Sequence, residues 1–239
     1  MNRCLSAAVL SLALAGGLAL GAQGQEVAPT FLKIEKPAAG TPILVAMPET
    51  HMALLTTAGA QPKEEWSQNA RIYLSAAVMD VVKGRSYEAV SVDPTAYEGS
   101  RDLQILKLND AVTSAIQYNT YVKLPTKTRF DWTVGDGAAE LRPDDAAKPA
   151  AYILFLSASG NYSSGGRMMM GAIMAAASGG AAGGALMAGG SQSITATLVD
   201  LNTGKIVWYR TAMYGGTTDL RTQAGEQEAV VKLFKDLPL

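Results

Sequence analysis

The amino-acid sequence predicts an α/β fold: a mixed sheet of about five strands with flanking helices, ending in a β-hairpin and a further helix. Two patterns predict this class. Short apolar runs typical of buried strands alternate with longer segments in which apolar side chains recur every three or four residues, as on an amphipathic helix. A turn between two late apolar runs adds an antiparallel pair to the strands that the helices connect.

The first half of the domain alternates strand and helix. Residues 41–47 form a continuous apolar run closed by Pro48, which is typical of a strand buried on both faces. Residues 62–83 contain no internal proline and space their apolar side chains as a helix does. Residues 87–92 alternate as a second strand, and residues 103–118 repeat the helical period.

The second half predicts three strands and a helix. Residues 151–156 are the most apolar strand candidate. Residues 194–201 and 205–214 flank Asn-Thr-Gly at 202–204, where glycine can take the positive φ of a tight hairpin turn. Residues 222–237 predict the last amphipathic helix.

The N-terminus predicts secretion. A short positive start containing Arg3 precedes an uncharged apolar run over residues 5–20, and small residues follow it. We interpret residues 1–24 as a cleavable signal peptide, residues 25–40 as an extended lead-in and residues 41–239 as a single α/β domain. The expected location is the periplasm, with association with the outer membrane as a second expectation.

Composition excludes several function classes. The 20 Lys and Arg against 21 Asp and Glu leave no cationic excess for a phosphate backbone, so we expect no nucleic-acid partner. The chain has one histidine, and its one cysteine, Cys4, lies in the signal segment. We therefore expect no multi-histidine metal site, no metal, no cofactor and no disulfide.

Two motifs could carry chemistry. Residues 160–167 have the glycine spacing of a phosphate-binding P-loop, but Gly166 and Arg167 stand where lysine and serine or threonine are required. Arg167 is either a contact for an anionic group at a helix N-terminus or a solvated side chain. His51 follows the first strand, in an expected loop of the kind that often carries chemistry in α/β proteins, but no Gly-x-Ser-x-Gly elbow accompanies it. We expect no enzyme; an enzyme using His51 and a polar loop over residues 157–167 is the remaining catalytic hypothesis.

Residues 168–190 are the strongest peculiarity, because they contain no charged residue. Small residues recur at four-residue spacing, which on a helix produces two ridges that allow close backbone approach, a glycine zipper. Three interpretations stay open: a helix pair or loop packed on the sheet or on a partner subunit, a membrane-inserting element, and a disordered insertion. The candidate residues for contact with a partner or membrane are Gly171, Ala175, Gly179, Gly183, Gly180 and Gly184.

Several stretches together resemble a poorly characterised family of bacterial envelope proteins, many of them lipoproteins. The resemblance covers about residues 41–237 and rests on Glu65-Trp66, residues 151–156, 163–167 (Ser-Ser-Gly-Gly-Arg), the small-residue run, 198–208 and Asp219-Leu220-Arg221-Thr222. The fold of that family is similar to the N-terminal domain of TolB and to the periplasmic domain of CsgG. Two features depart from the family: the lipobox cysteine is missing, and we see no channel-forming hairpins.

The resemblance implies a binding or assembly component of the envelope. We therefore expect a non-enzymatic protein that binds or helps assemble outer-membrane or periplasmic components, with envelope proteins or a second copy of itself as partners. The alternative function is a membrane-associating or pore-related oligomeric subunit that uses residues 168–190.

Overall fold

The structure is a computed structural model, and it describes residues 30–123, 125–143, 148–177, 190–215 and 218–239. The predicted signal peptide lies outside these residues. The elements are, in chain order, β1 (Thr30–Phe31), β2 (Pro42–Ala46), β3 (Glu49–Thr56), β4 (Gly59–Pro62), α1 (Glu64–Gly84), β5 (Glu88–Val92), η1 (Pro94–Tyr97), α2 (Arg101–Val122), η2 (Asp136–Leu141), β6 (Tyr152–Ser163), α3 (Gly165–Ala177), β7 (Ser191–Asp200), β8 (Ile206–Tyr214), α5 (Gln223–Leu233) and η3 (Phe234–Asp236).

The strands form one mixed sheet, which confirms the predicted fold class. Its order is β1-β8-β7-β6-β2-β5, with β3 also paired to β6 and β4 paired to β3. The β2 strand is parallel to both β5 and β6, whereas β6, β7 and β8 are antiparallel. The five predicted strands correspond to β2, β5, β6, β7 and β8, and β1 lies within the predicted lead-in, paired with β8.

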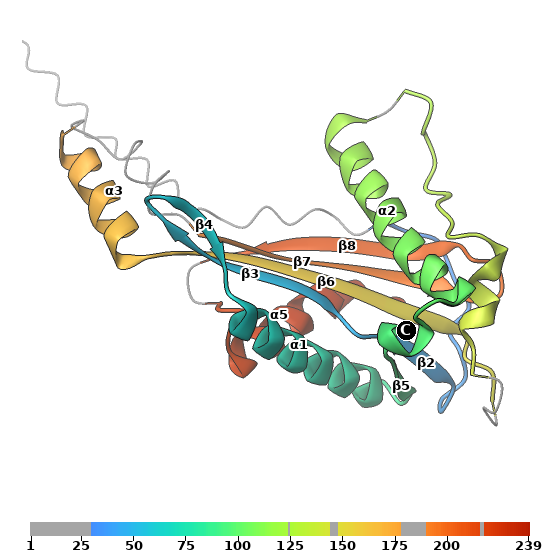
Figure 1. The fold of residues 1–239 in the computed structure, drawn as a ribbon. Helices are drawn as coiled ribbons and strands as arrows, with labels where there is room; N and C mark the ends of the chain where they lie inside the picture. The colour runs from blue at the N-terminus through green and yellow to red at the C-terminus, as the bar shows by residue number, and fades with distance from the viewer. Residues whose placement is uncertain (1–29, 124, 144–147, 178–189, 216–217) are drawn as a thin grey trace, which may run out of the picture.

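One face of the sheet is covered by α1 and α5, and α2 lies on the opposite face (Figure 1). The core under α1 and α5 contains Leu74, Leu154 and Trp208, and the Trp208 ring meets the Phe234 ring edge to face. The core under α2 is smaller and includes Leu106 and Ile153. Two buried layers therefore hold the sheet between helices, as an α/β domain requires.

A cluster of two aromatic rings and a guanidinium lies on the α1 face of the sheet, near the end of β6. The rings of Trp66 and Tyr162 meet edge to face, and the Arg221 guanidinium lies 3.9 Å from the Tyr162 centroid. Asp219 accepts two hydrogen bonds from the same guanidinium, at 2.9 and 2.7 Å. The Tyr162 hydroxyl donates to Gln192 Oε1 at 2.7 Å. These contacts join α1, β6, β7 and the segment before α5.

The turn between β7 and β8 is the hairpin that the sequence predicts. Gly204 has φ +63°, and its amide donates to the carbonyl oxygen of Asp200 at 2.8 Å. A Cβ atom at this position would lie 2.0 Å from the carbonyl oxygen of Gly135. The glycine is therefore required both by the backbone conformation and by a close approach of another loop.

Two predicted loops are strands. The segment over residues 157–167 was expected to be a polar loop, but β6 continues to Ser163 because residues 152–161 pair with β7. His51 was expected in a loop after the first strand, yet it lies in β3, where it pairs with Ser159 of β6. The long strands β3, β6 and β7 extend beyond the helices that cover the sheet, and α3 lies past their end (Figure 1).

Candidate functional site

The predicted zipper residues fall partly on α3. Gly171 is buried on this helix and Ala175 is half-buried. Gly179, Gly180, Gly183 and Gly184 lie outside the described residues. The first part of the predicted zipper is therefore helical. The two ridges of small residues, and their contact with a partner or membrane, stay a prediction.

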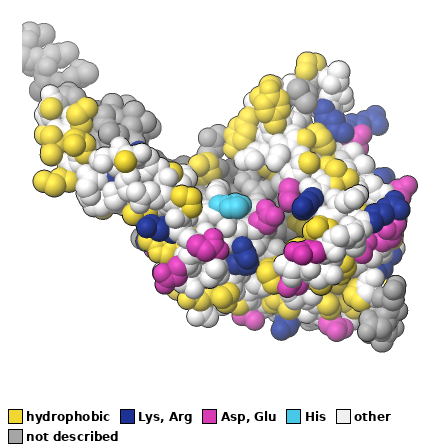
Figure 2. Space-filling view, in the orientation of Figure 1, with side chains coloured by type: hydrophobic (Ala, Val, Ile, Leu, Met, Phe, Trp, Pro, Cys, Tyr) yellow, Lys and Arg dark blue, Asp and Glu magenta, His cyan; other side chains and the backbone are white. Residues whose placement is uncertain are grey.

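Apolar side chains dominate the surface of α3. Figure 2 shows them gathered on the helix that projects from the body. Five large apolar side chains are exposed there: Met168, Met169, Met170, Ile173 and Met174. Contiguous exposed apolar surface of this kind is typical of a contact site rather than of an ordinary solvated helix.

The sequence with P-loop spacing is no phosphate loop. Gly160 is buried within β6, and a Cβ atom there would lie 2.5 Å from the sulfur of Met52. Its glycine is explained by packing against β3. Ser164 caps α3, because its hydroxyl accepts from the Arg167 amide at 3.2 Å. Arg167 lies in the first turn of that helix, and its role as an anion contact stays a prediction.

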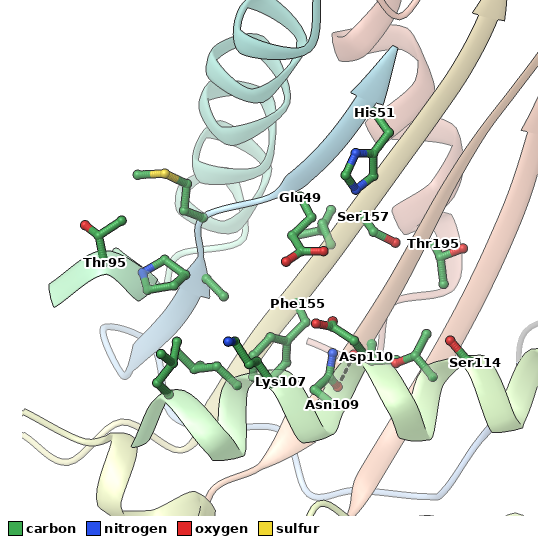
Figure 3. Close-up of a pocket in the computed structure, with 18 of the residues that line it drawn as sticks. Glu49, His51, Thr95, Lys107, Asn109, Asp110, Ser114, Phe155, Ser157 and Thr195 are labelled. Atoms are coloured by element: carbon green, nitrogen blue, oxygen red, sulfur yellow. Dashed lines mark hydrogen bonds between the residues drawn. The ribbon is translucent and has the colours of Figure 1, made fainter. Parts of the chain in front are cut away.

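A second candidate site is a pocket of about 470 Å³ under α2 (Figure 3). It lies where the chain interrupts its pairing along β6. The β2 strand pairs with β6 up to Val45, and pairing resumes at Glu49 in β3. Between them Met47 donates its amide to the carbonyl oxygen of Val92 in β5 instead. The site thus sits at the carboxyl ends of the parallel strands β2 and β5, the usual place for ligands in open α/β sheets.

The walls of the pocket come from separate elements. The sheet supplies Glu49 and His51 from β3, with Phe155 and Ser157 from β6. The helix α2 forms the opposite wall, and η1 closes one end. The lining residues from η1, from the residue that follows it and from α2 are Pro94, Thr95, Glu98, Leu103, Leu106, Lys107, Asn109, Asp110, Thr113, Ser114 and Gln117.

Two carboxyl groups face each other across this pocket. Figure 3 shows Glu49 on the sheet and Asp110 on α2 pointing into the same space. Loss of solvation in the pocket wall, followed by repulsion from the Glu49 charge, raises the pKa of Asp110 to about 6, and a hydrogen bond with Asn109 opposes the rise. Asn109 is itself held in place, because its Oδ1 accepts from the buried hydroxyl of Thr197 at 3.0 Å.

His51 lies at the rim of this pocket. Its side chain is exposed, and β3 places it on the same face as Glu49 because the two residues are separated by one position. Within the described residues, its ring makes no hydrogen bond to a carboxylate that would orient it as a general base. The pocket can therefore bind through charge and hydrogen bonds, whereas the catalytic hypothesis for His51 gains no support from the geometry.

Two further searches cover only the described part of the chain. It contains no cluster of three or more histidine, cysteine, aspartate or glutamate side chains arranged to hold a metal ion. None of its helices combines the length and the apolar character that crossing a bilayer requires.

The pocket residues Glu49 and Asp110 are functional candidates that sequence reasoning missed. They are separated by 60 positions and meet only because α2 crosses over the strand that carries Glu49. The available signal was the alternation in β3, where Thr50 and Met52 are buried and Glu49 and His51 are exposed. That pattern would have identified the strand and its outward face, but not the helix opposite.

The similarity of this chain to known proteins is distant. No known protein family matches the chain, and no curated protein matches it. Among solved structures, the PelC dodecamer from Paraburkholderia phytofirmans aligns with 88% of this chain and 97% of its own, at 10% identity and a TM-score of 0.40. A variant of the same dodecamer aligns with 90% and 97%, at 13% identity and a TM-score of 0.37.

Proposed function

We propose that this chain is a non-enzymatic component of the bacterial cell envelope that binds other envelope components and helps them assemble. We also propose that it belongs with the envelope family whose fold is similar to TolB and CsgG, and that it works in the periplasm, at or near the outer membrane. The predicted signal peptide over residues 1–24 and the quoted family stretches support the location.

The observation that carries the proposal is the apolar surface of α3. Met169 is 68% exposed and Ile173 is 52% exposed, on a helix whose described residues include a single charged side chain, Arg167. Methionine side chains adapt to irregular partner surfaces, and the small residues beside them let a second helix approach closely. A second copy of α3 offers the same apolar, small-residue surface, so self-association is the form of assembly that we propose.

A double substitution tests this assembly. We expect Met169→Lys with Ile173→Lys to shift the processed, untagged protein from oligomer to monomer in sedimentation velocity, because the paired helices would bring four lysines together. The matched control is Ile72→Lys with Val231→Lys, two equally exposed apolar positions on α1 and α5. A wild-type protein that stays monomeric at every concentration, or an α3 variant that assembles like the wild type, would contradict the proposal.

The exposed α3 methionines also favour a second candidate function, a membrane-associating or pore-related subunit. Apolar side chains on one helix can insert at the boundary between headgroups and acyl chains. Flotation with liposomes made from outer-membrane phospholipids separates the two. If wild-type monomers float with the liposomes and the Met169→Lys, Ile173→Lys protein does not, the helix contacts lipid rather than a second copy.

A further inference from the structure

The lining of the pocket under α2 carries more negative than positive charge. Its lining contains three carboxylates, Glu49, Glu98 and Asp110, against one ammonium group, Lys107. Opposed carboxylates in a partly dehydrated site repel each other, and a bound cation relieves that repulsion. The pocket is therefore suited to a positively charged ligand.

The rest of the lining favours a cation that carries a carbon skeleton. Leu103, Leu106 and Phe155 contribute apolar surface beside the carboxylates. A volume of about 470 Å³ is far larger than a bare ion needs and falls within the range of small-molecule sites. The described residues also hold no cluster of three ligands suited to a metal.

Polar groups in the wall add hydrogen-bonding capacity. The hydroxyl oxygen of Thr113 is buried beside the pocket and has no hydrogen-bond partner among the described residues. Ser114 and Gln117 follow on the same helix and also line the pocket, and Ser157 lines it from β6. Unpaired buried hydroxyls are uncommon in folded proteins, and a ligand that supplies a partner removes the cost.

We propose that this pocket binds a small organic ammonium compound, with the ammonium group between the carboxylates of Glu49 and Asp110 and the carbon skeleton over Phe155. The site lies on the body of the domain, away from α3, so it goes beyond assembly and would stand even if α3 made no contact with a partner (Figure 1). Its walls are formed by α2, by η1 and by the strands β3, β6 and β7, which the fold already holds in place.

His51 provides a reporter for the test, because it is the only histidine in the chain. In untagged protein, the ring proton signals of one residue at the rim can be followed by NMR without a full assignment. We would titrate putrescine, ethanolamine and choline in turn, with 1,4-butanediol as the uncharged analogue of putrescine and calcium chloride at equal ionic strength. Calorimetry on the same samples gives the affinity.

We expect at least one ammonium probe to shift the His51 signals saturably, and 1,4-butanediol to shift them little. Asp110→Asn should weaken that binding at least tenfold, and Glu49→Gln with Asp110→Asn should abolish it. Asp80→Asn, an exposed carboxylate on α1, is the matched control and should bind as the wild type does. Far-UV circular dichroism checks that each variant is folded.

Three results would overturn the proposal. The first is the absence of saturable binding for all three ammonium probes, and the second is equal binding by the folded Glu49→Gln, Asp110→Asn protein. The third is tighter binding of calcium than of any ammonium probe, which would make the site one for a metal cation. None of these results bears on the oligomeric state, so failure here and failure of assembly through α3 remain distinguishable.

Discussion

Glu226 is a buried acidic residue in the first turn of α5. It is fully buried, and neither carboxyl oxygen has a hydrogen-bond partner among the described residues. Loss of solvation raises its pKa from 4.5 to about 8, so the group is protonated in the folded protein at neutral pH. Loss of solvation is the main cause of the raised pKa values of Tyr162 and Tyr214, and the Glu226 charge adds to both, so this acid lies near two phenols.

The buried acid predicts a stability that falls as pH rises. Between about pH 4.5 and pH 8 the folded state keeps a proton that the unfolded state has lost, so each unit of pH costs about 1.4 kcal/mol of unfolding free energy. We expect urea unfolding at pH 5, 6.5 and 8 to show this loss in the wild type. Glu226→Gln should flatten it.

The control for this measurement is Glu228→Gln, which removes an exposed carboxylate two positions away that pairs with Lys232. That variant should keep the pH dependence of the wild type. If Glu226→Gln loses stability with pH as steeply as the wild type does, the titration belongs to another group.

At the scale of elements, Arg85 joins the end of α1 to the end of the chain. Its guanidinium donates to the carbonyl oxygens of Phe234, Leu237 and Leu239 at 2.5, 2.7 and 2.9 Å. These carbonyls follow α5, and α1 and α5 pack side by side over the same face of the sheet. One side chain therefore holds the end of α1 against the segment that follows α5.

Removal of that guanidinium should weaken the packing of α1 against α5. We expect Arg85→Met to lower the free energy of unfolding by about 1–3 kcal/mol, because three carbonyl acceptors lose a charged donor. Chemical denaturation measures the loss, and Lys83→Met, an exposed cation on the same turn, is the control. Equal stability of the two variants would show that water replaces the guanidinium without cost.

The sequence predicts most elements because their apolar patterns are local. The period of α1 and α2, the apolar run of β6 and the glycine turn at Gly204 all depend on neighbouring residues. The strand β3 was not predicted, because Pro48 is typical of the end of a strand. In the structure the chain resumes pairing with β6 one residue later. Partner strands, not propensity, decide such a continuation.

The two candidate sites differ in the same respect. The small-residue spacing that marks α3 lies within one short segment of the sequence, so sequence reasoning found Gly171 and Ala175. The pocket depends on α2 crossing the sheet above Glu49, and no local pattern specifies which turn of the helix lies over which strand. Asp110 and Thr113 therefore became candidates only once the fold was known.

At the scale of the whole molecule, burial is unevenly distributed. The strands β6, β7 and β8 contribute to both cores, whereas Gly171 is the only buried residue among those that the structure describes on α3. Local opening costs least where few apolar contacts are lost. The body and the projecting helix should therefore differ in stability.

Hydrogen exchange followed by mass spectrometry checks this difference. In the wild-type protein under monomeric conditions, we expect amides of α3 to exchange at least tenfold faster than amides of the equally helical α1. Under conditions that favour assembly, α3 should become protected while α1 changes little. Slow exchange of α3 in the monomer would mean that residues outside the described part of the chain already shield it.

The unbroken course of β6 has a mechanical consequence. The strand runs from the body to α3, and ten of its residues are paired in register with β7. The ladder hydrogen bonds lie across the strand direction, so a pull on α3 along β6 would load them together in shear, not one after another. An assembly held through α3 could then be put under tension, and the sheet would transmit that force to the body before the ladder separated.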